Sequence, residues 1–264
     1  MPNTDTAPIE VGLFVTCLAD LFRPEVAFAT IKLLEQAGCQ VEVPREQTCC
    51  GQPAFNSGDR HSSRAIARQT IAALEGYRYV VAPSGSCIGM LHSYPELFAA
   101  DDPWRARAQA LRARAFEISA FLVDRLQVRT SESGFKGRVT YHDACSGLRQ
   151  LGIKQQPRQL LAAIAGVELV EMAEAETCCG FGGTFCVKYP EISNRMVSDK
   201  IAAAVASGAD TLVAGELGCL LNIAGKLKRE GHALQVRHLV ELLADLEATP
   251  AIGEADPHPL GQPL

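Results

Sequence analysis

The residues best suited to chemistry in this 264-residue chain are its cysteines, eight of whose ten recur as one pattern in each half. The pattern is a single cysteine, an adjacent pair followed by glycine, and another single cysteine: Cys17, Cys49, Cys50 and Cys87, then Cys145, Cys178, Cys179 and Cys219. The first gap is 32 residues in one half and 33 in the other. Packing alone would not repeat thiols in this register, whereas two soft-metal sites would need the same thiolates from the same loops.

The composition decides how these cysteines are interpreted. A net charge of −5 argues against nucleic acid as a partner. Residues 1–10 lack the basic and apolar regions of a signal peptide, and no apolar run reaches the ~18 residues of a membrane span. We therefore expect a cytoplasmic protein without a membrane span of its own. In a reducing cytosol, spaced cysteines indicate metal binding or catalysis rather than disulfides.

Strands and helices are predicted to alternate in the same order in both halves. Apolar runs predict strands at 11–16, 40–43, 79–82, 138–142, 167–171 and 211–214. Helical patterns lie between them, and each half closes with an amphipathic helix, at 116–126 and 236–246. This order predicts an α/β fold with two pseudo-repeated lobes built from parallel β–α–β units.

The domain boundaries follow from the repeat. We expect a first cysteine-rich domain at 1–126, a polar linker at 127–136, and a second cysteine-rich domain at 137–248. Residues 249–264 are rich in proline without periodicity, which predicts a disordered tail. The single cysteines follow predicted strands, so the cysteine loops should meet at the C-terminal edges of the strands, where open α/β sheets bind ligands.

Glycines in the paired loops bear on what the cysteines could hold. A turn permitted by Gly51 or Gly180 would let both adjacent cysteines face one polynuclear cluster. Gly180, Gly182 and Gly183 would also expose backbone N–H groups to the bridging sulfides of such a cluster. Iron–sulfur clusters are held by cysteine thiolates, and each half supplies four of them.

These motifs resemble a known family. A cysteine, a Cys-Cys-Gly element and a final Cys-x-x-Cys define the cysteine-rich domain family, which includes the heterodisulfide reductase B subunit and the glycolate oxidase iron–sulfur subunit. The segments CLADLFRPEV, PSGSC and CCGFGGTFCVKYPEIS look most like the lactate utilization protein A group of that family. The resemblance implies an iron–sulfur electron-transfer subunit of an oxidoreductase that oxidises L-lactate to pyruvate. It also implies two partner subunits, at least one of them an iron–sulfur protein.

The chain departs from the family pattern at two positions. The first cysteine of the final Cys-x-x-Cys is Ser84 in one half and Glu216 in the other, so four cysteines remain in each. An ordinary [4Fe–4S] cluster in each half fits four thiolates, and so does a non-cubane cluster with an oxygen ligand or an open iron. Glu216 is the candidate oxygen ligand, and the sequence does not choose between the cluster types.

Other functions stay open at this point. A catalytic iron–sulfur subunit acting on a disulfide or another small acid, or a zinc-stabilised interaction scaffold, would use the same cysteines. No G-x-G-x-x-G motif follows the first strand, so we expect neither NAD nor FAD in this chain. His142 and Asp143 are candidates for proton transfer or substrate binding, although a hydrogen-bonded turn is the more ordinary role. Cys39 and Cys186 lie outside the repeat. We expect Cys39 in the core and Cys186 beside the second site.

Overall fold

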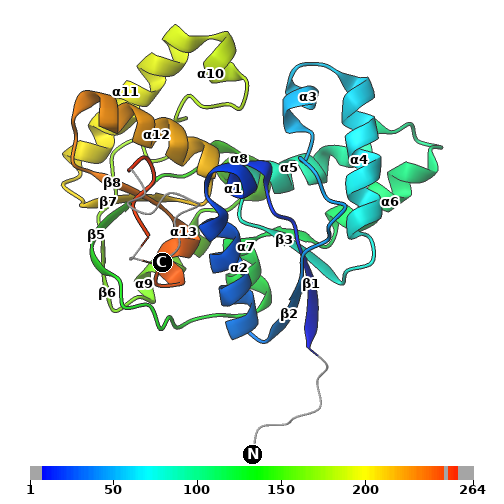
Figure 1. Ribbon diagram of the computed structural model, residues 1–264, viewed down its shortest axis with the longest axis horizontal. Coiled ribbons are helices and arrows are strands. Elements are labelled where there is room, and N and C mark those ends of the chain that lie inside the picture. Colours follow the sequence, from blue (N-terminus) through cyan, green and yellow to red (C-terminus); the bar gives the residue numbers. More distant parts are fainter. Residues whose placement is uncertain (1–7, 247–248, 255–264) are drawn as a thin grey trace, which may run out of the picture.

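The computed structural model describes residues 8–246 and 249–254 as two lobes, each built on a four-stranded parallel sheet (Figure 1). The strands of the first lobe are β1 (Ile9–Leu13), β2 (Cys39–Glu42), β3 (Tyr79–Ala82) and β4 (Ala115–Glu117). Those of the second are β5 (Lys136–Tyr141), β6 (Gly166–Leu169), β7 (Thr211–Ala214) and β8 (Gln235–His238). The predicted two-lobed α/β fold is confirmed.

The two sheets have the same topology. Their strand orders are β2-β1-β3-β4 and β6-β5-β7-β8, with every neighbouring pair parallel. In each sheet the first strand therefore pairs with the second on one side and with the third on the other. The chain leaves these two central strands in opposite directions, which opens a crevice at their carboxyl ends, where ligands bind in such sheets.

Helices connect the strands in both lobes. Those of the first lobe are α1 (Cys17–Phe22), α2 (Pro24–Gln36), α3 (Gln52–Asn56), α4 (Arg60–Leu74), α5 (Gly85–Ser93), the 3₁₀ helix η1 (Tyr94–Leu97), α6 (Pro103–Arg112), α7 (Ile118–Ala120) and the π-helix η2 (Phe121–Arg125). Those of the second lobe are α8 (Cys145–Leu151), α9 (Gln155–Ala162), α10 (Phe185–Lys188), α11 (Pro190–Ala206), α12 (Leu217–Glu230) and α13 (Leu239–Leu243). None of the helices in the described part of the chain combines the length and apolarity needed to cross a membrane.

The closing helix of each half begins later than the sequence predicted. Residues 115–117 and 235–238 are the fourth strands β4 and β8, not the first turns of helices. Each helix starts only after a capping side chain: the Glu117 carboxylate accepts from the Ser119 N–H, and the His238 ring accepts from the Val240 N–H. Over so few residues, these apolar runs fit the periodicity of a helix as well as that of a strand. They form strands because they pair with β3 and β7.

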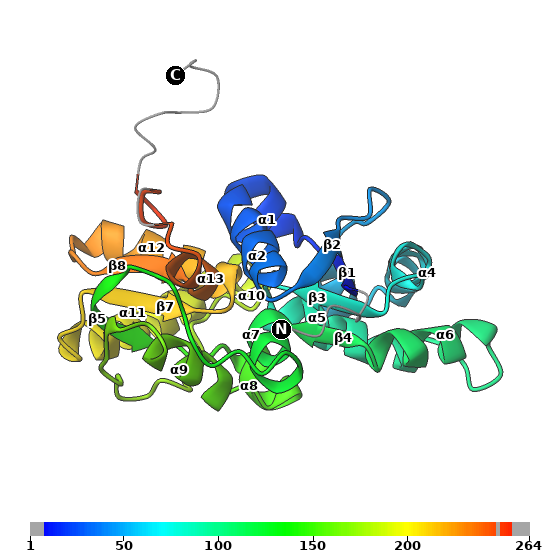
Figure 2. The ribbon, with the colours of Figure 1, turned by 90° about the horizontal axis from the view of Figure 1, so that it is seen from below.

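The lobes pack on each other through matched elements. Helix α5 contacts α8, and the equivalent helices α12 and α1 also contact each other. In the same way, α2 contacts α13, and α9 contacts α7. Figure 2 shows α1 and α2 on one side of the junction and α7 and α8 on the opposite side. Arg23 pairs with the buried carboxylate of Glu241 at 2.7 Å, and Lys32 donates to the Ala244 carbonyl at 2.7 Å. One hydrophobic core runs from the second lobe into α1, α2 and β1 of the first, so the lobes share a core.

Residues 249–254, which the sequence placed in a disordered tail, pack against this junction. Ala251 and Ile252 are buried, and the Ile252 N–H donates to the Val236 carbonyl at 2.8 Å. Ile252 belongs to the hydrophobic core beside β8, which proline content alone could not indicate. Residues 255–264 of the predicted tail lie outside the described residues.

Candidate metal centre

Four cysteines of the first lobe meet at the carboxyl ends of β1 and β3. Cys17 is the first residue of α1, and Cys87 lies in the first turn of α5. The sulfur atoms of Cys17 and Cys49 are 3.8 Å apart, and the Cys50 thiol interacts with the thiols of both Cys49 and Cys87. Cys50 and Cys87 are buried whereas Cys17 and Cys49 are half-buried, so the group extends from the core to the surface.

The second lobe repeats this arrangement at the ends of β5 and β7. Cys145 begins α8, Cys219 lies in the first turn of α12, and the 178–179 pair lies in the loop after β6. The Cys178 thiol interacts with those of Cys145 and Cys179, and Cys179 also interacts with Cys219. Cys179 and Cys219 are buried, as their counterparts in the first lobe are. The eight cysteines singled out by spacing therefore form two groups of four.

A left-handed glycine fixes each cysteine pair. Gly51 and Gly180 both have φ +82°, which side chains rarely adopt. A Cβ at Gly180 would lie 2.7 Å from the Ser193 carbonyl oxygen, so α11 also excludes a side chain there. This turn directs the Gly51 N–H to the Cys49 sulfur at 3.5 Å and the Gly180 N–H to the Cys178 sulfur at 3.4 Å. Gly182 and Gly183 also have positive φ.

The first cysteine of each pair is the favoured thiolate. The pKa of Cys49 is lowered to about 2, chiefly by the hydrogen bond from the Cys17 thiol and then by that from Cys50. The pKa of Cys178 is lowered to about 2 by the matching hydrogen bonds from Cys145 and Cys179. The same interactions, with burial, raise the pKa values of Cys17 and Cys145. In each group the first cysteine of the pair is thus the thiol that ionises most readily, and the thiolate is the form that binds metal.

A profile of the cysteine-rich domain family matches this chain twice, over residues 11–92 and 139–224. Each match contains one group of four cysteines. The chain belongs to the cysteine-rich domain family. The first cysteine-rich domain accordingly carries Cys17 to Cys87, and the second carries Cys145 to Cys219.

Curated relatives agree with the family assignment. The chain is 45% identical over 241 residues to a lactate utilization protein A of Halalkalibacterium halodurans, covering 91% of this chain and 99% of that protein. It is 47% identical over 235 residues to a lactate utilization protein A of Geobacillus kaustophilus, covering 89% and 98%. The resemblance to this group that the motifs indicated is confirmed.

The fold is also seen in a solved structure. A hypothetical protein from Helicobacter pylori superposes with a TM-score of 0.61 at 14% identity, over 95% of this chain. The chain spans 50% of the length of that structure. At this identity the likeness supports the architecture alone.

The surroundings of the two sites differ although their cysteines match. In the first cysteine-rich domain the buried Tyr94 hydroxyl donates to the Cys50 carbonyl at 2.8 Å. In the second, the Asn222 side chain donates to the Cys179 carbonyl at 2.9 Å. Lys200 is 1% exposed in the second domain, and its ammonium donates to the Ala175 carbonyl at 3.2 Å and attracts the thiolates of that site. Burial lowers the pKa of Lys200.

Glu216, the predicted oxygen ligand, contacts the other lobe. Its carboxylate accepts from the Ser84 hydroxyl at 3.0 Å and from the Ser86 N–H at 2.9 Å. Burial raises the pKa of Glu216. The two residues that replace the family's cysteines are therefore bonded to each other across the junction, and this argues against a ligand role for Glu216. The spacing of the residues could not reveal this pairing, because it depends on how the lobes dock.

His142 and Asp143, three and two positions before Cys145, have separate surroundings. The Asp143 carboxylate accepts two hydrogen bonds of 2.8 Å from Arg158. This ion pair explains why the carboxylate of Asp143 can be buried, and the role of Asp143 is therefore structural. His142 is fully buried, and burial lowers its pKa to about 3, with Lys200 acting in the same direction. The imidazole is therefore neutral at physiological pH, which does not suit the predicted proton-transfer role.

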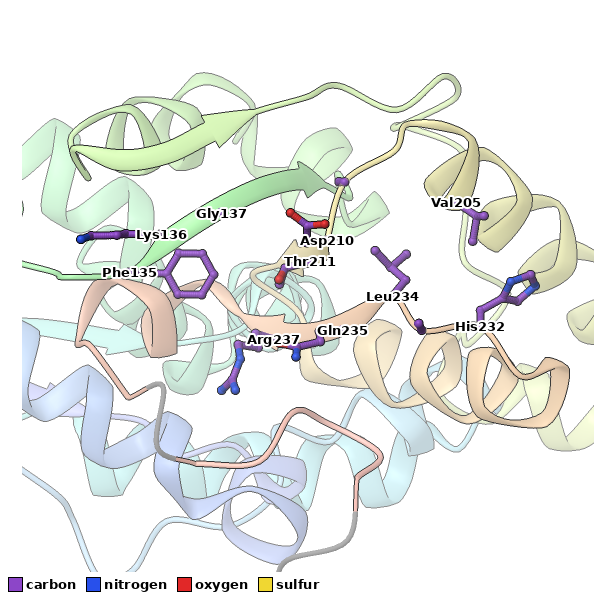
Figure 3. Close-up of a pocket in the computed structure, with 12 residues that line it drawn as sticks. Phe135, Lys136, Gly137, Val205, Asp210, Thr211, His232, Leu234, Gln235 and Arg237 are labelled. Atoms are coloured by element: carbon purple, nitrogen blue, oxygen red, sulfur yellow. The ribbon is translucent and has the colours of Figure 1, made fainter.

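The remaining sequence features lie around these sites. Cys39 is buried in the core, and Cys186 is half-buried, with its thiol 3.4 Å from the Gly183 carbonyl. A cavity of about 630 Å³ lies near the amino ends of β5, β7 and β8, with Phe135, Asp210 and His232 among its lining residues (Figure 3). That is the edge of the sheet opposite the cysteines, so the cavity is no part of the metal centre.

Proposed function

We propose that this chain is an iron–sulfur electron-transfer subunit of a multi-subunit oxidoreductase that oxidises L-lactate to pyruvate. The observation that carries the proposal is the pair of four-thiol groups, each at the crevice of its own sheet. Four converging thiolates are the ligand set of a [4Fe–4S] cluster, and each domain supplies one such set. The curated relatives' printed name, lactate utilization protein A, supports the substrate.

The surroundings of the thiols favour a cluster that exchanges electrons. Each site has two buried cysteines and two half-buried ones, so a cluster would lie close to the surface without being open to bulk water. Backbone N–H groups at Gly51 and Gly180 already point to sulfur. Such donors offset the anionic charge of thiolates and tune the potential of a bound cluster.

Exposed apolar side chains beside both sites support a role as one subunit among several. Leu21 and Phe22 follow Cys17 in α1 and are 71% and 63% exposed. Val187 and Tyr189, beyond the second cysteine pair, are 78% and 54% exposed. Neighbouring apolar side chains of this size on a surface mark protein interaction sites. We assign these two patches to the partner subunits, at least one of which is itself an iron–sulfur protein.

Reduction by substrate tests the proposal. The chain is purified anaerobically alone and together with the partner subunits encoded by its source organism, and visible absorption is followed after L-lactate is added. The expected result is bleaching of the cluster absorption in the complex and none in the isolated chain, because lactate is oxidised elsewhere in the assembly. Bleaching of the isolated chain would instead support a catalytic cluster in this subunit. No bleaching in the complex would refute electron transfer from lactate.

A zinc-stabilised scaffold is the second candidate, and one distance favours it. The 3.8 Å between the Cys17 and Cys49 sulfurs is what a tetrahedral zinc ion with bonds of about 2.3 Å requires. Such a protein would be colourless and would hold about two zinc ions per chain, one for each set of four thiolates. Metal and sulfide analysis of the purified chain separates the two functions.

A further inference from the structure

The side chain of His142 is buried, and both of its ring nitrogens lack a well-formed hydrogen bond in the described part of the chain. It is fully buried, and within the described residues neither of its ring nitrogens makes a hydrogen bond of normal geometry, although the Ala175 carbonyl lies close enough to interact with the ring. Leaving a buried polar group unpaired costs about 1–3 kcal/mol. The second domain buries the polar ring of His142 at this cost, although an apolar side chain would fill the same space. A ligand supplied from outside the chain would account for it.

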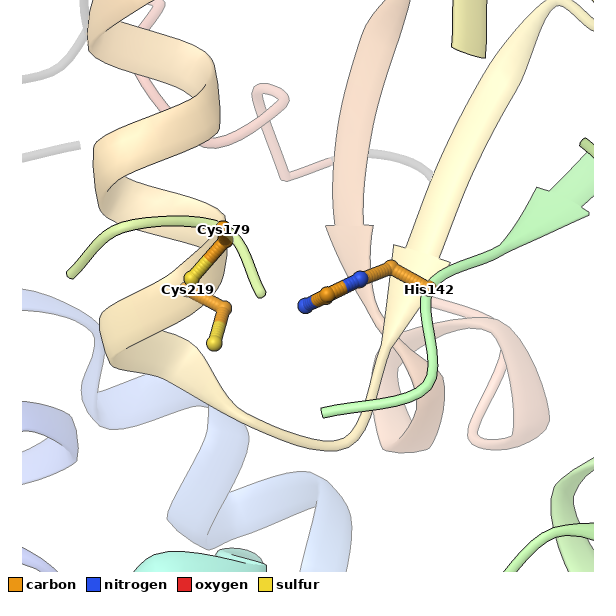
Figure 4. Close-up of side chains that lie close together, drawn as sticks. All are labelled: His142, Cys179 and Cys219. Atoms are coloured by element: carbon orange, nitrogen blue, oxygen red, sulfur yellow. The ribbon is translucent and has the colours of Figure 1, made fainter. Parts of the chain in front are cut away.

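The ring points into the second cysteine group. Figure 4 shows the imidazole extending from the end of β5 toward the sulfur atoms of Cys179 and Cys219. A ring nitrogen and the two sulfurs all lie within 4.8 Å of one another, and all three residues are buried. Donors bound to one metal centre through bonds of about 2.0–2.3 Å lie at this scale of separation. Three elements, β5, the cysteine loop and α12, therefore bring one nitrogen and two sulfurs to one point.

The first domain has no equivalent nitrogen. The Phe14 N–H donates to the Val81 carbonyl at 2.8 Å, and the His142 N–H donates to the Val213 carbonyl at 2.9 Å. Each of these two residues stands three positions before its cysteine, Cys17 or Cys145, at the same point of the sheet. Phe14 is also fully buried. The packing position thus accepts an aromatic hydrocarbon, so the sheet itself does not require histidine.

We infer that His142 is a nitrogen ligand of the metal group bound by the second cysteine-rich domain, which makes the two metal sites of this chain chemically different. For an iron–sulfur group, this inference rests on the function proposed above. In a four-iron cluster with four protein ligands, the imidazole takes the place of one of the four thiolates. That exchange raises the potential of an iron–sulfur centre, and the ammonium of Lys200 acts in the same direction. The second centre is therefore the more easily reduced of the two.

The test uses the full-length chain, labelled with ¹⁵N-histidine and purified anaerobically, with iron and sulfide measured on the same sample. Pulsed EPR should show the strong nitrogen coupling of a directly bound imidazole in one of two cluster signals. His142→Phe, which copies the side chain found at Phe14, should abolish that coupling and lower the potential of that signal alone. His61→Phe, at an exposed position, should leave both unchanged.

The possible failures can be told apart. Iron and sulfide in the wild type, with only the weak couplings of backbone amides before and after His142→Phe, would overturn the inference and leave the proposed function intact. Bound zinc without sulfide would overturn the proposed function. In that case X-ray absorption decides on His142: a nitrogen contribution that His142→Phe removes supports the ligand, and an all-sulfur shell in the wild type overturns it.

Discussion

Replacing Glu216 by alanine tests whether this carboxylate joins the lobes or binds metal. It is buried at the junction and accepts hydrogen bonds from the Ser84 hydroxyl and the Ser86 N–H. Glu216→Ala leaves the half-buried Ser86 N–H without its acceptor and leaves the buried Ser84 hydroxyl with only the Ser86 hydroxyl, at 3.2 Å, as a partner. An unsatisfied buried donor costs about 1–3 kcal/mol and a half-buried one costs less, so the free energy of unfolding should fall by about 1–4 kcal/mol. Ser84→Ala removes one of these bonds and the cap on the Cys87 N–H, and should cost about 1–2 kcal/mol.

The assay is urea unfolding of the anaerobically prepared chain, followed by far-UV circular dichroism, for both single variants and the double variant. Because Ser84 and Glu216 bond to each other, the double variant should be more stable than the sum of the single losses by about 1–2 kcal/mol. Glu216→Gln retains an acceptor and should lose less than Glu216→Ala.

Metal content separates this account from the ligand alternative. All these variants should bind as much metal as the wild type. If Glu216→Ala lost half the bound metal while its coupling with Ser84→Ala were near zero, Glu216 would be a ligand of the second site and the reasoning from the junction would be refuted.

Three further perturbations probe the charges and surfaces around the sites. Burial raises the pKa of Glu117 to about 7 from an ordinary 4.5, so the folded chain holds this proton more tightly than the unfolded chain. Protonated Glu117 therefore makes its full contribution to stability below about pH 4.5, and this contribution is lost as the pH rises through 7. The free energy of unfolding should fall by up to about 3 kcal/mol over that range. Glu117→Gln should flatten that part of a stability curve measured between pH 4.5 and 8, and an unchanged slope would contradict it. Lys200→Met removes the buried ammonium beside the second site, so a redox titration should find one potential lowered and the other constant; equal shifts of both would place the charge elsewhere. Phe22→Ser removes an exposed apolar side chain next to the first site, and co-purification of partner subunits should weaken by about tenfold, since burying such a side chain is worth about 1.5–3 kcal/mol. Unchanged co-purification would remove this patch from the interface.

The sequence predicted an element best where its apolar periodicity agreed with the residues that begin or end such elements. The strand at 79–82 and the helix at 190–206, which begins at a proline, have the predicted bounds. The strand predicted at 11–16 instead ends at Leu13, because Thr16 caps α1. The grouping of the eight cysteines followed from spacing, since residues after parallel strands meet at one edge.

The features that sequence reasoning missed depend on how distant segments dock. The fourth strands β4 and β8 are defined by their pairing with β3 and β7. A run of three or four residues does not indicate such pairing. The bond between Ser84 and Glu216 requires the two lobes to be in contact. His142 was a candidate for proton transfer or substrate binding from its place before Cys145. Its burial beside the sulfurs of Cys179 and Cys219, which points to a ligand role, is a property of the packed core.

The account is tested most directly by iron and acid-labile sulfide analysis of the anaerobically purified chain, its Cys179→Ser variant and its Cys39→Ser variant. With one four-iron cluster in each domain, the wild type should hold about eight iron and eight sulfide ions per chain. Cys179→Ser should lose about half of each, because only the second domain loses a ligand. Cys39→Ser should retain all of it, since Cys39 lies at the amino end of β2, the edge of the sheet opposite the cysteine groups. Zinc without sulfide in the wild type, or iron lost on Cys39→Ser but not on Cys179→Ser, would contradict the account.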